Sequence, residues 1–236
     1  MDDFYSQAFN FATAVQGGVD MRTGLFNISI PLLQIHGNDN LGPTLPLALS
    51  YTPLNAVDAG LGIGWTLGLS RYDRKAKRLS LSSGEQYMVQ ESPDSVSLRQ
   101  QKLDSLRFEK RGDGYRVLRK TGEVEILSGP DLANDIKVPL KLYSPLGHQL
   151  ELEWDLTRSP PRLLSVRDER QHVFLRIAYP DGGTRSQTTL QVWPDTVEAY
   201  EITLSFQNGY LTQLRPGGAQ PALDWTFDYE SVGGRN

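Results

Sequence analysis

The 236-residue chain contains no cysteine. A disulfide framework, a thiol nucleophile and a cysteine-ligated metal are therefore excluded. Long apolar runs are also missing, since no stretch approaches the roughly 18–20 residues that a membrane-spanning helix requires. The N-terminal sequence MDDFYSQAFNFATAVQGG has neither a basic region nor an apolar core. We therefore expect no Sec signal peptide and no membrane span.

An excess of charge of one sign is lacking too. The 24 Lys and Arg residues and 28 Asp and Glu residues leave a net charge of −4, which argues against nucleic acid or an anionic membrane as the main partner. His36, His148 and His172 each stand beside a turn, without a second ligand at helical spacing. HExxH, GxSxG and Walker patterns are absent. We expect no catalytic residue, no cofactor and no metal, and interpret the chain as a non-enzyme.

What the chain has in abundance is a two-residue period. Apolar and polar residues alternate in 25–32, 45–51, 140–144, 148–156, 173–179, 200–206 and 223–229. This alternation is typical of strands with one buried face. Asp-Gly and Asn-Gly pairs lie between alternating runs in 108–118 and 204–214, which predicts tight hairpins. We predict an all-β, antiparallel meander of hairpins with about fifteen strands, strongly curved because so large an open sheet does not stay flat.

Three sections are predicted along the chain. Residues 1–22 form an N-terminal arm, and residues 23–130 form a first β-sheet section. The turn-rich sequence at 127–139 separates this from a hairpin-rich section, residues 131–236. In that last section a strand, a polar turn and a second strand recur as a degenerate repeat, a pattern typical of units that stack on their neighbours.

A glycine-rich run, DAGLGIGWTLGLSRYD, occupies residues 58–73. A dinucleotide-binding loop requires G-x-G-x-x-G between a strand and a helix. Here Gly60, Gly62 and Gly64 are two residues apart, and strand-like alternation follows them. We predict that they clear one face of an extended chain, so that another backbone or a bulky side chain can lie on it.

Aromatic residues leave a second interpretation open. The chain has four tryptophans, Trp65, Trp154, Trp193 and Trp225. Three of them lie inside alternating segments, which favours core packing. Exposed aromatics stacking on sugar rings would instead make a carbohydrate-binding β-domain, and this remains the alternative.

Four ordered segments carry a family resemblance: TGLFNISIPL, GPTLPLALSYTP, GLGIGWTLGLSRYDR and LSSGEQYMV. Together they resemble the opening of Rhs/YD-repeat proteins and the SpvB-like start of toxin-complex B subunits. The matching residues are Thr23, Gly24, Pro31, Pro46, Leu47, Leu49, Tyr51, Gly62, Gly64, Trp65 and Leu67. The likeness extends over roughly 17–229, but well-formed YDxxGRL repeats are absent.

The resemblance implies a role that is structural rather than catalytic. It implies that the chain is the N-terminal section of a hollow β-shell that encloses a C-terminal toxin domain, truncated before the later repeats. The site residues would then be structural: Thr23, Gly24, Pro46, Tyr51, Gly62, Gly64 and Trp65. The expected partners are the rest of the shell, the toxin cargo, or a second copy paired at exposed strand edges. The implied location is a bacterial cytoplasm, followed by export through a route other than Sec.

Overall fold

The computed structural model describes residues 16–19, 26–93, 95–99, 105–129, 135–179, 187–217 and 224–230. These residues form nineteen strands, and their one helical turn is a 3-10 turn at Asn38–Asn40. The prediction of an all-β chain built from antiparallel hairpins is confirmed. The strands are more numerous than the sequence indicated, and they form two sheets instead of a single meander.

The smaller sheet is a four-stranded antiparallel layer, here called the hairpin sheet. Its strands, in order, are β1 (Gln16–Val19), β2 (Phe26–His36), β3 (Thr44–Tyr51) and β4 (Trp65–Thr66). The register between β2 and β3 shifts between Pro31 and Leu33. This bulge changes the parity of β2, so Leu32 and Leu33 are both buried although they are adjacent. A strict alternation would have exposed one of them.

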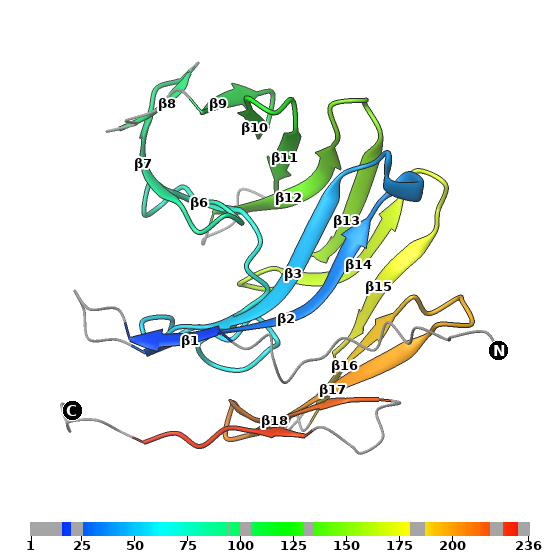
Figure 1. Ribbon diagram of the computed structural model, residues 1–236. Coiled ribbons are helices and arrows are strands. Elements are labelled where there is room, and N and C mark those ends of the chain that lie inside the picture. Colours follow the sequence, from blue (N-terminus) through cyan, green and yellow to red (C-terminus); the bar gives the residue numbers. More distant parts are fainter. Residues whose placement is uncertain are drawn as a thin grey trace.

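The second half of the chain is a meander in sequence order (Figure 1). Its strands are β12 (Ile136–Tyr143), β13 (Gln149–Asp155), β14 (Arg162–Asp168), β15 (Val173–Ala178), β16 (Gln187–Val192), β17 (Tyr200–Gln207), β18 (Tyr210–Pro216) and β19 (Trp225–Thr226). The Asn208–Gly209 turn joins β17 to β18, with φ of +53° and +82°. Both values are positive, as the two-residue hairpin turn predicted there requires.

The strands between these two regions curl into a ring, here called the small barrel (Figure 1). They are β5 (Arg71–Asp73), β6 (Arg78–Ser80), β7 (Gln86–Glu91), β8 (Val96–Leu98), β9 (Leu106–Arg111), β10 (Gly114–Arg119) and β11 (Val124–Ser128). The ring forms because β12 pairs with β11 and also, through Ile136 and Lys137, with β5. β8 and β9 are in contact where the ring meets itself. Tyr72, Phe108 and Tyr115 fill its interior, with ring centroids 4.8–5.3 Å apart.

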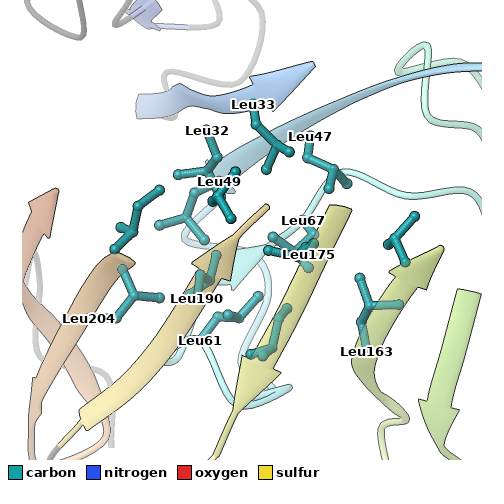
Figure 2. Packing of buried hydrophobic residues seen from close by; sticks show 14 of the residues in the cluster. Leu32, Leu33, Leu47, Leu49, Leu61, Leu67, Leu163, Leu175, Leu190 and Leu204 are labelled. Atoms are coloured by element: carbon teal, nitrogen blue, oxygen red, sulfur yellow. The ribbon is translucent and has the colours of Figure 1, made fainter. Parts of the chain in front are cut away.

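The larger core lies between the hairpin sheet and the meander. Figure 2 shows Leu32, Leu33, Leu47 and Leu49 of β2 and β3 above Leu175, Leu190 and Leu204 of β15, β16 and β17. The core therefore joins the two sections predicted to meet near residue 130. Those section boundaries remain predictions, and of the 1–22 arm only residues 16–19 are described.

The tip of the β2–β3 hairpin is tied to the meander by polar contacts. Asn38 donates to Glu169 at 2.6 Å, and Arg170 pairs with Asp39 at 2.8 Å. Asn38 and Asp39 have positive φ, a conformation that asparagine and aspartate tolerate better than most residues. These contacts, together with the leucine layer, hold the hairpin sheet in place over β13–β15.

Removing one leucine from the interface is expected to test this packing. Leu49 is fully buried, so Leu49→Ala should lower the free energy of unfolding by about 2–5 kcal/mol through lost burial and a cavity. Leu146, which is 70% exposed, provides the same chemical change without the cavity. Leu146→Ala should shift stability by less than about 0.5 kcal/mol in urea unfolding. Equal losses in the two variants would contradict the packing.

Candidate functional site

The residues that the sequence singled out converge on one segment, residues 58–65, here called the glycine–tryptophan segment. Its residues 58–64 connect β3 to β4 without forming a strand, and Trp65 begins β4. Gly60, Gly62 and Gly64 have φ of +100°, +100° and +90°, values that favour glycine because a Cβ clashes there. The prediction of an extended glycine strand is therefore wrong in conformation. The two-residue spacing of these glycines instead reflects a backbone that adopts a positive φ at every second residue.

The groups that pack against the three glycines are other residues of this chain. A Cβ at Gly60 would collide with the Tyr179 ring, and one at Gly64 would collide with the Tyr51 ring. At Gly62 a Cβ would lie 2.9 Å from the backbone nitrogen of Leu211. Bare backbone is needed at all three positions because the segment rests directly on neighbouring strands and rings.

Trp65 follows the glycines and is 1% exposed. Its indole Nε1 donates to Tyr229 Oη at 2.8 Å, and Tyr229 Oη donates to the Leu211 carbonyl at 2.8 Å. The indole also packs against Tyr51, with ring centroids 5.2 Å apart, and against Phe227 at 5.0 Å. Burial raises the pKa of Tyr229, which keeps its hydroxyl protonated as a donor.

Hydrogen bonds occupy the backbone of the segment. Asp58 Oδ1 accepts from the amides of Gly60 and Gly62 at 2.7 and 2.9 Å. Thr188 Oγ1 donates to the Gly60 carbonyl at 3.0 Å, and the Ile63 amide donates to Gly209 at 2.9 Å. A phosphate-binding loop needs free amides, and here a carboxylate of the chain already holds two of them. The segment acts as a buried strap.

The remaining predicted site residues fall in different places. Pro46 is an exposed residue of β3 opposite Gln34. Tyr51 ends β3, pairs with Trp65 across the ladder and joins the aromatic group around it. Thr23 and Gly24 lie outside the described residues. The structure thus brings together Tyr51, Gly62, Gly64 and Trp65, and it leaves Pro46 apart from them.

Sequence reasoning missed two residues of this site, Asp58 and Tyr229. A local signal existed for Asp58, because an aspartate two residues before a glycine commonly accepts that residue's amide in an Asx turn. For Tyr229 there was none, since it lies 164 residues from Trp65 in the chain.

Within the described ranges, no group of three or more His, Asp or Glu residues is placed to hold a metal ion. Glu151 of β13 is bound by Lys141 and Arg167, each at 3.1 Å. Those two bonds lower its pKa, and partial burial offsets only part of the shift. No helix in the described residues is long and apolar enough to cross a membrane.

One ionic cluster stands out inside the small barrel. Glu91 accepts hydrogen bonds from Tyr72 Oη at 3.1 Å and from Tyr115 Oη at 2.7 Å. Arg74 lies 3.4 Å from the same carboxylate and 2.7 Å from Asp135. The cluster links the ends of β5 and β7 with β10 and with the residue before β12. It ties strands together around the ring.

The cluster shifts the pKa values of its members. Burial alone would raise the pKa of Glu91, but hydrogen bonds from Tyr115, Arg74 and Tyr72 outweigh burial and lower it. Burial, together with the Glu91 carboxylate, raises the pKa of both tyrosines. Glu91 is therefore ionised and both phenols are neutral donors across the ordinary pH range.

Solved structures of Tc toxins resemble this chain in fold. No family model matches the chain, and no curated protein matches it in sequence. The crystal structure of TcdB2-TccC3 superposes on 90% of the chain with a TM-score of 0.58 and 12% sequence identity. The Photorhabdus luminescens Tc holotoxin pore, with a mutated TccC3, superposes on 91% with a TM-score of 0.53 and 12% identity.

The chain has a Tc toxin-like fold. The resemblance seen in the sequence is supported at the level of the fold only. A sequence identity of 12% shows no more than a shared fold. The matched region makes up only 16% of either Tc chain. The chain therefore spans about a sixth of the length of these structural neighbours.

The strap in this Tc toxin-like fold can be tested with one matched pair of glycines. Gly62→Ala places a methyl against the Leu211 backbone at a positive φ, and we expect a loss of about 2–5 kcal/mol. Gly147 has a φ of +89° but nothing within 4 Å of its Cβ position, so Gly147→Ala should cost only about 1–2 kcal/mol. Urea unfolding followed by tryptophan fluorescence measures both. Equal losses would refute close contact at Gly62.

The barrel cluster generates a prediction about acid. Because the pKa of Glu91 is lowered in the folded state, its contribution is complete above about pH 4.3, the value for an unfolded glutamate. That contribution is lost as the pH falls through the lower folded value. Glu91→Gln should be about 1–3 kcal/mol less stable at neutral pH and should lose less further stability on acidification. Urea unfolding at several pH values measures both effects.

Tyr115→Phe serves as the graded control for Glu91. It keeps the ring packed in the barrel but removes the shortest hydrogen bond to the carboxylate. Its acid sensitivity should lie between those of the wild-type chain and Glu91→Gln. If the wild type and Glu91→Gln lose stability in parallel as the pH falls, the stabilising role of the ionised Glu91 is wrong.

Proposed function

We propose that the chain is a non-enzymatic structural segment of a larger β-shell that encloses a C-terminal toxin domain and helps to deliver it. One observation carries the proposal: nearly the whole chain superposes on a small part of a much longer Tc protein. The matched region is 16% of the Tc chain. We therefore expect this chain to work as one part of the wall of a larger shell. The names of both neighbouring structures, TcdB2-TccC3 and the Tc holotoxin pore, refer to more than one toxin component or to a holotoxin.

The strand edges support this role. β19 pairs with β18 through only two residue pairs, Gln213 with Thr226 and Leu214 with Trp225. In the described part of the chain, no further strand lies beyond β19 or beyond β1. An open edge of a large sheet presents unpaired amides and carbonyls to another strand. These edges suit a further shell segment, toxin cargo or a second copy as partner.

The ionic and histidine-containing contacts support a structural role. Glu91 is held by tyrosines of β5 and β10, and Glu151 by residues of the neighbouring strands β12 and β14. His148 pairs with Glu169 at 2.8 Å across two turns. Each of these contacts ties one β element to another. Manufacture in a bacterial cytoplasm and export without Sec form part of the same proposal.

The alternative of a carbohydrate-binding domain gains nothing from the tryptophans. Trp65 is buried, and the other three are half-buried against the larger core. Trp154 also uses its Nε1 to donate to the Pro139 carbonyl at 2.7 Å. A sugar-stacking platform needs an exposed ring face, and all four tryptophans are buried or half-buried.

The shell role can be tested on the complete product of the gene that encodes this chain. Cryo-electron microscopy should show a hollow β-shell with this segment in its wall and density in the lumen. In limited trypsin digestion, the region C-terminal to the shell should resist cleavage until mild denaturant opens the wall. A particle without a lumen, or cleavage as fast as in the isolated C-terminal region, would refute enclosure.

A further inference from the structure

A hollow of about 970 Å³ separates the hairpin sheet from the outer wall of the small barrel. Residues of β1, β2 and β3 line one side, and residues of β5 and β6 line the other. Its volume lies at the upper end of the range for ligand pockets. The polar residues that matter most are Ser29, Ser50, Thr66, Arg71, Arg78 and Ser80. Tyr51 of the aromatic group around Trp65 also lines the hollow, whereas none of these six polar residues belongs to the glycine–tryptophan segment or to the barrel interior.

The two arginines are aimed away from the barrel core. Tyr72 and Leu79, which pair across β5 and β6, are both fully buried inside the barrel. Side chains alternate along a strand, so Arg71 and Arg78 belong to the outer face. They line the hollow, and no Asp or Glu lines it. A chain with 28 acidic residues and a net charge of −4 has thus kept this surface free of carboxylates.

The arginines have no acidic partner within the part of the chain that the structure describes. None of the ion pairs among the described residues involves Arg71 or Arg78. Asp73 lies opposite Arg78 in the ladder and two residues from Arg71, and its Oδ1 accepts the Ala76 amide at 2.8 Å. Burial lowers the pKa of Arg71; Asp73 opposes this shift and Arg78 adds to it. Asp73 therefore compensates the burial of Arg71 only in part, and a partly desolvated cation of this kind favours an anion beside it.

The geometry beside the arginines suits a polypeptide. Gly17 and Gly18 of β1 line the hollow, and in the described ranges β1 pairs only with β2. A Cβ at Gly18 would have nothing within 4 Å, so the backbone there is open to approach. Strand addition to an exposed sheet edge is a general mode of peptide recognition. The Ser29 and Ser50 hydroxyls, 3.4 Å apart, add donors on the same side.

We propose that this hollow binds an extended, acidic polypeptide segment, with carboxylates at Arg71 and Arg78 and backbone pairing along β1. Charge complementarity selects the acidic partner. The free edge and the bare glycines favour polypeptide over an acidic glycan. The proposal does not depend on the shell role, because it concerns only the charge and the shape of this surface.

Binding can be measured with a fluorescein-labelled oligoglutamate peptide of about ten residues, by fluorescence anisotropy on the 236-residue chain. Arg71→Gln combined with Arg78→Gln should weaken binding by about tenfold or more. Arg71→Lys with Arg78→Lys should retain part of the affinity. Raising salt from about 0.1 M to about 1 M should weaken wild-type binding, because the screening length falls from roughly 10 Å to 3 Å.

The matched control removes two charges elsewhere. Arg107 and Lys120 are exposed barrel residues that do not line the hollow. Arg107→Gln combined with Lys120→Gln changes the net charge by the same amount and should leave affinity unchanged. Equal weakening by both double variants would mean general attraction and would overturn the proposal. Circular dichroism and thermal unfolding establish that each variant is folded.

Two further readouts decide the class of ligand. Hydrogen exchange at residues 16–19 should slow when the oligoglutamate peptide is bound, because strand addition protects backbone amides. No added protection would overturn pairing along β1. A sulfated oligosaccharide serves as the competing anion. If it binds through Arg71 and Arg78 while oligoglutamate does not, the polypeptide assignment is wrong.

Discussion

The structure depends above all on covering the apolar face of a long, curved sheet. β14 to β18 present one continuous layer of buried side chains, including Leu163, Leu190 and Leu214. A sheet with such a face is stable only when another layer excludes water from it. The β2–β3 hairpin and the glycine–tryptophan segment provide that layer from the N-terminal part of the chain (Figure 2). The two halves of the sequence therefore share one core.

Close approach of backbone explains the composition of the strap. Where residues 58–65 lie on the meander, the distance left at Gly62 is too short for any side chain. The polar atoms exposed by this bare backbone are satisfied by Asp58, Thr188 and the Gly209 carbonyl. Trp65 then closes the site against Tyr229 and Phe227. The aromatic group seals a region where glycine alone would leave gaps.

β12 is the junction at which the sheet divides. Its C-terminal part pairs with β13 and continues the meander, whereas Ile136 and Lys137 pair with β5 and close the barrel. Lys137 is almost fully buried and donates to the Gly129 carbonyl at 2.8 Å. A buried ammonium group needs such a partner, so this bond favours one pairing of β12 over others. The barrel interior is thereby sealed, and its outer wall faces the hollow.

The sequence by itself determined the all-β class, many of the strands and several turns. Alternation depends only on neighbouring residues, and the Asn208–Gly209 hairpin depends on two positive φ values that those residues adopt readily. The sequence also indicated that Gly62, Gly64 and Trp65 form part of one structural segment. Their turning conformation was not foreseen, because glycines two residues apart fit both a strand and a turn.

Only the tertiary structure decided which strands meet. Tyr72 pairs with Lys137, and Trp65 bonds to Tyr229, across separations that a two-residue period does not encode. The bulge at Pro31 likewise changed which residues of β2 face the core. Each of these contacts depends on which sheets pack against each other and bury the same apolar surface. That choice is settled by packing and by the partners of buried polar groups, which no local pattern contains.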